Sequence, residues 1–209
     1  MYFGRLQIRK KVKMIKILLF IKHKCGFIWT IVEWFNSLLF GILYSKKLSL
    51  LQGQLDVVNR NSAYKVELLG KEDMQPLAAF FTKQPEEYFG FFKPHKFDHG
   101  SLLRKNREKS FIMIGVRDGN SIIGYGFLRC FINGKSFRGK MVDVDYQGKG
   151  IAKQLGVAMT FMAEVLNLRL YATISKDNVK SIASSKAVNN IRIIKELPDN
   201  YLYVEYLRK

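Results

Sequence analysis

The sequence predicts a mixed α/β fold preceded by an N-terminal helical extension, and three observations support this prediction. The chain has 209 residues, of which 48% are hydrophobic, so it is long enough for one domain with an appendage. From about Ser62 onward, strand-like patterns alternate with helix-like patterns. Before that point, residues 1–60 carry eleven Lys or Arg against two acidic residues. We therefore predict a basic, aromatic helical extension at 1–60 and an α/β domain at 61–209.

Composition narrows the class of protein. The two cysteines, Cys25 and Cys130, cannot form a disulfide framework, and no cysteine or histidine spacing matches a zinc site. We therefore predict a reduced, cytoplasmic location and no metal. The formal net charge is +18, but no motif of a nucleic-acid-binding fold accompanies it, so we predict no nucleic-acid partner.

The extension combines a basic head with an apolar segment. The first 25 residues hold eight Lys or Arg and no acid, and an apolar run follows from Phe27 to Tyr44. That run is long enough to span a membrane, but a span would place the rest of the chain outside the cytoplasm. Glu33 and the lack of a small-residue cleavage site argue against a secretory signal.

Two interpretations of the extension stay open. In the first, residues 1–47 make a peripheral contact with an anionic membrane. In the second, the helices bury their aromatic face against protein, either on the main domain or on a second copy in a homodimer.

The first half of the domain is predicted to contain strands, helices and a three-stranded meander. Alternating apolar residues predict the strands, and apolar residues at helical spacing predict the helices. Gly, Asn and Pro mark the turns and one aromatic loop. In chain order we predict a strand at 64–69, a helix ending at 81, a short helix at 85–91, a loop at 91–100, a helix at 101–108, and strands at 111–116, 121–131 and 138–144.

The second half begins with a glycine-rich turn between a strand and a helix. Gln147-Gly148-Lys149-Gly150 opens a helix that is predicted to run to about Leu166. A strand at 169–174, a helix at 178–187 and strands at 191–197 and 201–207 complete the domain. The first strands of the domain follow one another through turns, which favours antiparallel pairing, and the later strands are separated by helices, which permits parallel pairing. This order indicates a sheet of mixed direction.

The segment Asp143–Ala152, DVDYQGKGIA, carries the clearest chemical signal. A glycine-rich turn ahead of a helix lets backbone amides approach an anion, and the helix N-terminus adds partial positive charge. The turn lacks GxxxxGK[ST], and Lys153 stands where GxGxxG needs its third glycine. We therefore predict a phosphate-binding turn that belongs to neither of these nucleotide motifs.

Residues Gln147 to Ala152 resemble the Q/R-x-x-G-x-G/A signature of the GCN5-related N-acetyltransferase (GNAT) superfamily, and residues 61–209 have the length and element order of its fold. The resemblance covers about the last 150 residues and leaves the extension unexplained. It implies that acetyl-CoA is the cofactor. The implied pyrophosphate ligands are Gln147, Gly148, Lys149, Gly150, Ile151 and Ala152; Met141, Val142 and Asp143 are implied to line the pantetheine arm, and Asn178 to contact the cofactor.

The chain departs from the GNAT pattern where family members carry catalytic groups. The position of the family's tyrosine acid falls at Ser185, and the third and fourth strands offer no carboxylate as a base. We predict that His95, oriented by Asp98, accepts the proton of the acceptor amine, since a histidine titrates near neutrality. Tyr125 and Arg129, near the expected acceptor cleft, are predicted to bind the substrate.

The resemblance thus implies an acetyl-CoA-dependent N-acetyltransferase in which a primary amine attacks the thioester directly. We predict a small-molecule acceptor, and the basic aromatic extension suggests an amino sugar in surface-polysaccharide assembly at the inner face of the membrane. Two alternatives remain. One is acetylation of a protein, a peptide or a soluble small amine. The other is a non-catalytic module that binds acyl-CoA or associates with a membrane.

Overall fold

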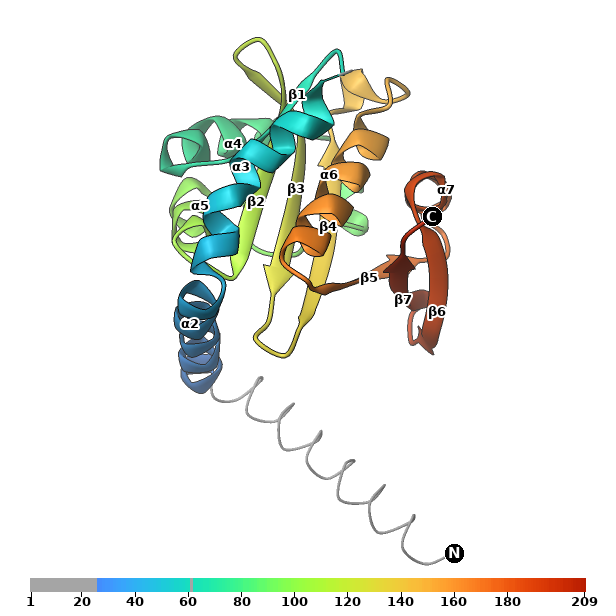
Figure 1. The fold of residues 1–209 in the computed structure, drawn as a ribbon. Helices are drawn as coiled ribbons and strands as arrows, with labels where there is room; N and C mark the ends of the chain where they lie inside the picture. The colour runs from blue at the N-terminus through green and yellow to red at the C-terminus, as the bar shows by residue number, and fades with distance from the viewer. Residues whose placement is uncertain (1–25, 61) are drawn as a thin grey trace, which may run out of the picture.

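The computed structural model describes residues 26–60 and 62–209, and predictions about residues 1–25 lie outside this part. One seven-stranded sheet is covered by helices, which confirms the predicted mixed α/β class (Figure 1). The helices are α2 (Gly26–Leu43), α3 (Ser45–Asn59), α4 (Met74–Thr82), α5 (His99–Asn106), α6 (Ile151–Val165) and α7 (Val179–Val188), with 3-10 turns η1 (Lys71–Asp73), η2 (Glu86–Gly90) and η3 (Val144–Tyr146). The strands are β1 (Lys65–Leu68), β2 (Phe111–Asp118), β3 (Ser121–Cys130), β4 (Lys135–Val142), β5 (Arg169–Ser175), β6 (Asn190–Leu197) and β7 (Tyr201–Leu207).

The sheet has the strand order β1-β2-β3-β4-β5-β7-β6. Neighbouring strands are antiparallel except for β4 and β5, which are parallel. Parallel neighbours need a crossover connection, and α6 supplies it. We call β1–β4 and β5–β7 the two halves of the sheet. Figure 1 shows β6 and β7 set apart from β4, with α6 between the two halves.

Several elements differ slightly from the sequence-based predictions, and three of the differences have a local structural cause. β4 begins at Lys135 rather than 138, because Gly134 adopts φ +77° in a tight turn that lets Ser136 pair with Cys130. α5 begins at His99, inside the predicted loop, because the Asp98 carboxylate caps it. The short helix predicted at 85–91 is the 3-10 turn η2.

Two apolar clusters hold the sheet between its helices. Alternate residues of β2 belong to different clusters, Ile112 and Ile114 to one and Phe111 and Met113 to the other, so the clusters lie on opposite faces of the sheet. The first packs α3 and α6 against the sheet. The second packs α4, α5 and the aromatic loop before α5.

α3 shares its core with the sheet. Leu51 and Leu55 are 1% and 0% exposed and belong to the first cluster. The Asn59 side chain donates to the carbonyl of Val66 and accepts from its amide, at 2.8 Å each. A domain boundary near residue 60 remains a prediction, and this core extends across it.

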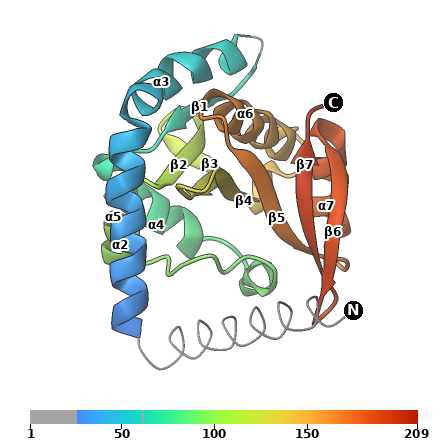
Figure 2. The same cartoon turned by 60° about the horizontal axis from the view of Figure 1, so that its bottom comes forward.

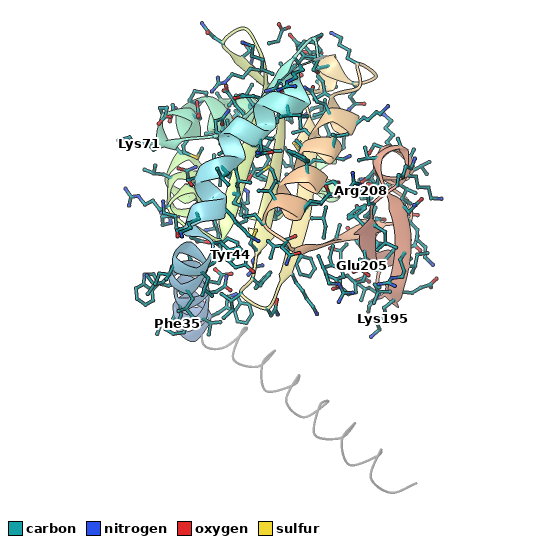
Figure 3. The ribbon with its side chains drawn as sticks, in the orientation of Figure 1. Phe35, Tyr44, Lys71, Lys195, Glu205 and Arg208 are labelled. Atoms are coloured by element: carbon teal, nitrogen blue, oxygen red, sulfur yellow. The ribbon has the colours of Figure 1, made fainter. Side chains whose placement is uncertain are left out.

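α2 meets the domain with its polar stripe. Glu33 accepts hydrogen bonds from Arg129 Nη2 at 2.5 Å and from Lys105 Nζ at 3.3 Å, and Asn36 Nδ2 donates to the carbonyl of Cys130 at 3.0 Å. The apolar side chains on its outer surface are 44–66% exposed: Ile31, Val32, Trp34, Phe35, Leu38, Ile42 and Leu43. We call this set the α2 apolar face; Figure 3 labels Phe35, and Figure 2 shows α2 along one edge of the molecule.

This orientation divides the aromatic side chains of α2 within the described residues. Phe40 is buried in the first cluster, whereas Trp34 and Phe35 are 62% and 53% exposed. Packing on protein and contact with a membrane both remain predictions for the exposed side chains. No helix in this part of the chain is long and apolar enough to cross a membrane.

Candidate functional site

β4 and β5 are paired only over their first residues. Their parallel pairing runs from Lys135↔Arg169 to Phe137↔Tyr171, while β4 continues to Val142. We call residues 138–142 the open edge of β4. Backbone donors and acceptors along an unpaired strand edge are available to pair with an extended ligand. This edge therefore offers hydrogen bonds to an amide-bearing arm.

The glycine loop predicted from the sequence follows the open edge through η3. Gly148 and Gly150 adopt φ +79° and +82°, a left-handed conformation that favours glycine. A Cβ added at either position would meet no atom within 4 Å, so the space in front of the loop is open. Gly150 also stands directly before α6, whose first amides have no partner inside the helix. This geometry suits a phosphate group.

Asp143 fixes the loop to the end of α4. Its side chain is buried, and its two oxygens accept from Gln84 Nε2 at 3.2 Å and from the amide of Asp145 at 3.0 Å. Gln84 Oε1 in turn accepts from the amide of Val144 at 3.1 Å. The carboxylate of Asp143 is thus already engaged, and its backbone is the part that remains suited to line an arm.

The other predicted cofactor residues are placed around this loop. Met141 is buried in the second cluster, Val142 packs against the first, and Ile151 is buried in the first. Because these side chains are in the cores, the open edge presents backbone at Met141 and Val142. Lys149 Nζ lies 4.2 Å from the ring centroid of Tyr146.

Gln147 and Asn178 have partners within the chain. Gln147 donates to the hydroxyl of Tyr88 at 2.8 Å and accepts from Lys180 Nζ at 3.1 Å, so it joins η2 to α7 across the loop. Asn178 caps α7 by accepting from the amide of Ser181 at 3.0 Å. The cofactor contacts implied for these two side chains remain predictions.

A buried arginine and a half-buried lysine under the open edge were missed by the sequence analysis. Arg138 is 6% exposed and donates to Gly156 and Asn189 oxygens, yet its Nη2 has no hydrogen-bond partner among the described residues. Lys140 Nζ donates to the carbonyl of Ala152, in the first turn of α6, at 2.8 Å. Burial, assisted by the nearby charge of Arg138, lowers the pKa of Lys140 to about 7.

The signal for this pair was present in the sequence. Arg138 and Lys140 alternate along a strand, so their side chains point to the same face, and the helix that follows covers that face. Basic side chains are usually solvated, and the alternation alone does not show that α6 buries them.

His95 is held among aromatic rings. Its neighbours include Phe97, Phe111 and Tyr125, with ring centroids 5.2–6.0 Å away. Nδ1 donates to the carbonyl of Lys96 at 2.8 Å, so Nε2 of the neutral ring accepts from the Tyr125 hydroxyl at 3.0 Å. Burial lowers the pKa of His95, which keeps the ring neutral.

The predicted partner of His95 is engaged elsewhere. Asp98 accepts from the amide of Ser101 at 2.9 Å, and hydrogen bonds from Ser101 lower the pKa of its carboxyl. The tautomer of His95 is thus set by the Lys96 carbonyl and not by Asp98. A proton-accepting role for His95 stays a prediction.

The two predicted substrate residues also bind protein groups. Tyr125 is fully buried, and burial raises the pKa of its hydroxyl well above the ordinary value. Arg129 pairs with Glu33 of α2 and lies 5.3 Å from the Phe131 ring centroid. The structure therefore gives Arg129 a role in attaching α2 to β3.

Comparison with known proteins identifies the fold. No protein-family model and no curated protein matches the chain. The GNAT domain of S. lividans PAT matches with a TM-score of 0.60 and 16% identity, over 68% of this chain and 89% of that one. The ribosomal-protein-S5-alanine acetyltransferase from Vibrio fischeri matches with 0.57 and 19%, over 71% and 94%. AAC(6')-Ib, solved with paromomycin and acetyl-CoA, matches with 0.56 and 12%, over 71% and 94%.

This chain therefore has the GNAT fold, as its sequence predicts. The site residues also fit an anionic, extended cofactor such as acetyl-CoA. The open space before Gly148 and Gly150 suits phosphate oxygens, and the open edge suits amide groups. Arg138 and Lys140 place positive charge beneath that edge.

Proposed function

We propose that the protein is an acetyl-CoA-dependent N-acetyltransferase that acetylates a primary amine. The observation that carries the proposal is the continuous path from the open edge of β4 to the glycine loop. Unpaired backbone groups lead to a helix N-terminus, which fits an amide-bearing arm that ends in phosphates. The GNAT-fold neighbour solved with acetyl-CoA supports this function.

Acetyl-CoA would supply an activated thioester. The amides from Gly148 to Ala152 hold the phosphates, and the open edge of β4 orients the arm. Backbone donors of the same edge are fixed by the sheet, so they stabilise the charge that develops on the carbonyl oxygen without reorganising. Lys140 adds a positive charge beneath the loop and favours the anionic ligand.

The proposed acceptor is a small-molecule amine, with an amino sugar in surface-polysaccharide assembly as the specific candidate. A neighbour of the same fold was solved with paromomycin, which supports a small acceptor. The net charge of +18 disfavours strongly basic acceptors, because like charges repel on approach. The polysaccharide role rests on the proposed location at the inner face of the membrane.

For that location we propose that the α2 apolar face docks on an anionic membrane. Large exposed apolar patches mark interaction sites, and the seven side chains of this face are 44–66% exposed. A groove between α2 and α5 is lined by Trp34 and Ile42 and by the basic side chains of Arg104, Arg107 and Lys109. Glu33 and Glu108 also line it, and both pair with Lys105. Apolar groups beside basic ones complement a bilayer of anionic lipids, and the basic residues of the first 25 positions add to that charge. A second copy of the chain would match the apolar groups but not the basic ones.

The proposed activity is tested by calorimetric titration of the full chain with acetyl-CoA. The full chain is needed because Leu51 and Leu55 of α3 complete the core. We expect micromolar binding that Gly148→Glu/Gly150→Glu weakens at least about tenfold through bulk and like charge.

A matched control separates these effects from backbone strain. Gly119→Glu/Gly134→Glu adds the same charge at two other left-handed glycines, in the β2–β3 and β3–β4 turns, and should bind as the parent does. If the folded parent does not bind acetyl-CoA, the loop is only a helix start and the proposed activity is wrong.

A further inference from the structure

The side chain of Arg138 crosses beneath the point where β4 and β5 separate. It begins on β4, one residue beyond the last β4–β5 pair. Its guanidinium carbon lies 3.4 Å from the ring centroid of Tyr206 on β7, and its Nη1 donates to Thr160 of α6 at 3.1 Å and to Asn189 at 3.1 Å. Because β7 lies on the far side of β5, the guanidinium spans both halves of the sheet.

This guanidinium is buried without a counter-ion. All of its hydrogen-bond partners in the described part of the chain are uncharged oxygens, and Nη2 has none. Lys140 lies two residues away on the same face, and its partner is also a carbonyl. A buried cation without an anion is unfavourable. A negative charge that forms beside Arg138 would therefore be strongly stabilised.

The position of Arg138 along the strand indicates which atom of the bound cofactor could carry this negative charge. In the proposed function the phosphates lie on the glycine loop and the arm runs back along the open edge through Met141. Arg138 lies about 10 Å further along the strand than Met141, at about 3.3 Å per residue. The sulfur end of the arm points toward it. Two atoms become negative at this end, the carbonyl oxygen and the leaving sulfur. In the proposed function the backbone donors of the open edge hold the oxygen, so the sulfur is left for Arg138.

We propose that Arg138 is a catalytic residue that stabilises the departing CoA thiolate by its charge. In the transfer the amine nitrogen bonds to the acyl carbon, the carbon–sulfur bond breaks with its electron pair on sulfur, and the ammonium proton passes to water. Arg138 holds the thiolate until solvent protonates it. This inference rests on the proposed function and assigns a leaving-group role within it.

The surroundings of Ser185 support a role for the charge of Arg138, and not for a proton donor, in stabilising the thiolate. Ser185 occupies the position of the family's tyrosine, and its hydroxyl is 3.2 Å from the hydroxyl of Tyr206. Tyr206 is buried, and its hydroxyl is engaged with Ser185 while its ring packs against Arg138. The charge of Arg138 thus lies beside the position from which the usual acid is missing.

The test is the pKa of the CoA thiol bound to the full-length protein, read from thiolate absorbance in the ultraviolet during a pH titration. Free CoA in the same buffer is the reference. An opposite charge within contact distance lowers a pKa by about 1–3 units, so we expect at least about tenfold more thiolate in the complex at a given pH.

Substitutions assign the shift to Arg138. Arg138→Met should return the thiol pKa to the free value, and Arg138→Lys, which keeps the charge, should retain most of the shift. Arg192→Met removes an arginine of β6 that pairs with Glu205 and should leave the thiol pKa unchanged. Circular dichroism shows whether each variant is folded.

The outcomes are separable. If the parent binds CoA but its thiol pKa equals that of free CoA, the inference is overturned whatever the variants do. A shift that survives in folded Arg138→Met also overturns it. If the parent does not bind CoA at all, the proposed function itself fails.

Discussion

Replacing Lys140 by methionine should remove a pH dependence of stability that the structure assigns to this one side chain. Lys140 is half-buried on β4, and its Nζ donates to the carbonyl of Ala152 on α6. Burial is the main cause, and the charge of Arg138 the second, of a pKa of about 7. Methionine has a similar length and no charge, so the substitution tests the charge.

The magnitude follows from proton linkage. In the unfolded chain a lysine has a pKa of about 10.4. Between about pH 8 and that value, the unfolded state holds nearly one more proton at this residue than the folded state, and at pH 7 it holds about half a proton more. The free energy of unfolding therefore rises with pH, by about 1.36 kcal/mol per unit. Since the folded lysine is still half protonated at pH 7, the rise from pH 7 to pH 9 should be about 2.3 kcal/mol.

Urea unfolding of the parent and of Lys140→Met at pH 7, 8 and 9 measures this contribution. We expect the stability of the parent to rise relative to the variant across the series. The buried Cys130 thiol, whose pKa burial raises, acts in the opposite direction but equally in both proteins. Lys153→Met, at an exposed position on α6, should keep the parent's dependence. If parent and Lys140→Met change in parallel, folding does not lower the pKa of Lys140 and this account of the site is incorrect.

Two further predictions concern the extension. Leu55→Ala should lower the free energy of unfolding by about 2–5 kcal/mol, because Leu55 is fully buried. The control Val57→Ala, at a 46% exposed position of α3, should change it by less than about 0.5 kcal/mol. Equal effects of the two substitutions in urea unfolding would contradict a core role for α3. Both tryptophans lie on α2, so their fluorescence should shift to shorter wavelength when anionic vesicles are added but not when neutral vesicles are added. The shift should be smaller in Trp34→Ser than in Val179→Ser, an exposed control on α7. The absence of a shift, or a stable dimer in sedimentation in which the tryptophans are buried, would refute membrane docking.

Much of the fold could be predicted because its signals are local. The alternation at 111–116 and 121–131, and the Asp-Gly-Asn turn between them, depend on neighbouring residues and gave β2 and β3 nearly at their observed limits. The glycine loop was also predictable, since left-handed backbone at Gly148 and Gly150 favours glycine whatever surrounds it. Element order then led to the GNAT fold.

The candidate catalytic residues were harder to predict because their partners come from distant segments. Asp98 and His95 are three residues apart, but Asp98 caps a helix that starts beside it, and His95 turns toward Tyr125 on β3. Arg129 was read as facing substrate, but α2 covers it through Glu33, 96 residues away. The partners of these side chains within the chain therefore depend on tertiary packing, and the predicted roles of His95 and Arg129 toward substrate remain predictions.

The sequence by itself determined the mixed α/β class, the order of the elements and the glycine loop, because hydrophobic periodicity and the backbone needs of glycine are short-range properties. Only the tertiary structure decided that the polar stripe of α2 faces the domain, that Arg138 is buried beneath the open edge of β4, and that Lys140 is half-buried beside it. Burial and electrostatic partners depend on segments that pack together from far along the chain, and these set whether a charged side chain is solvated or held in the site.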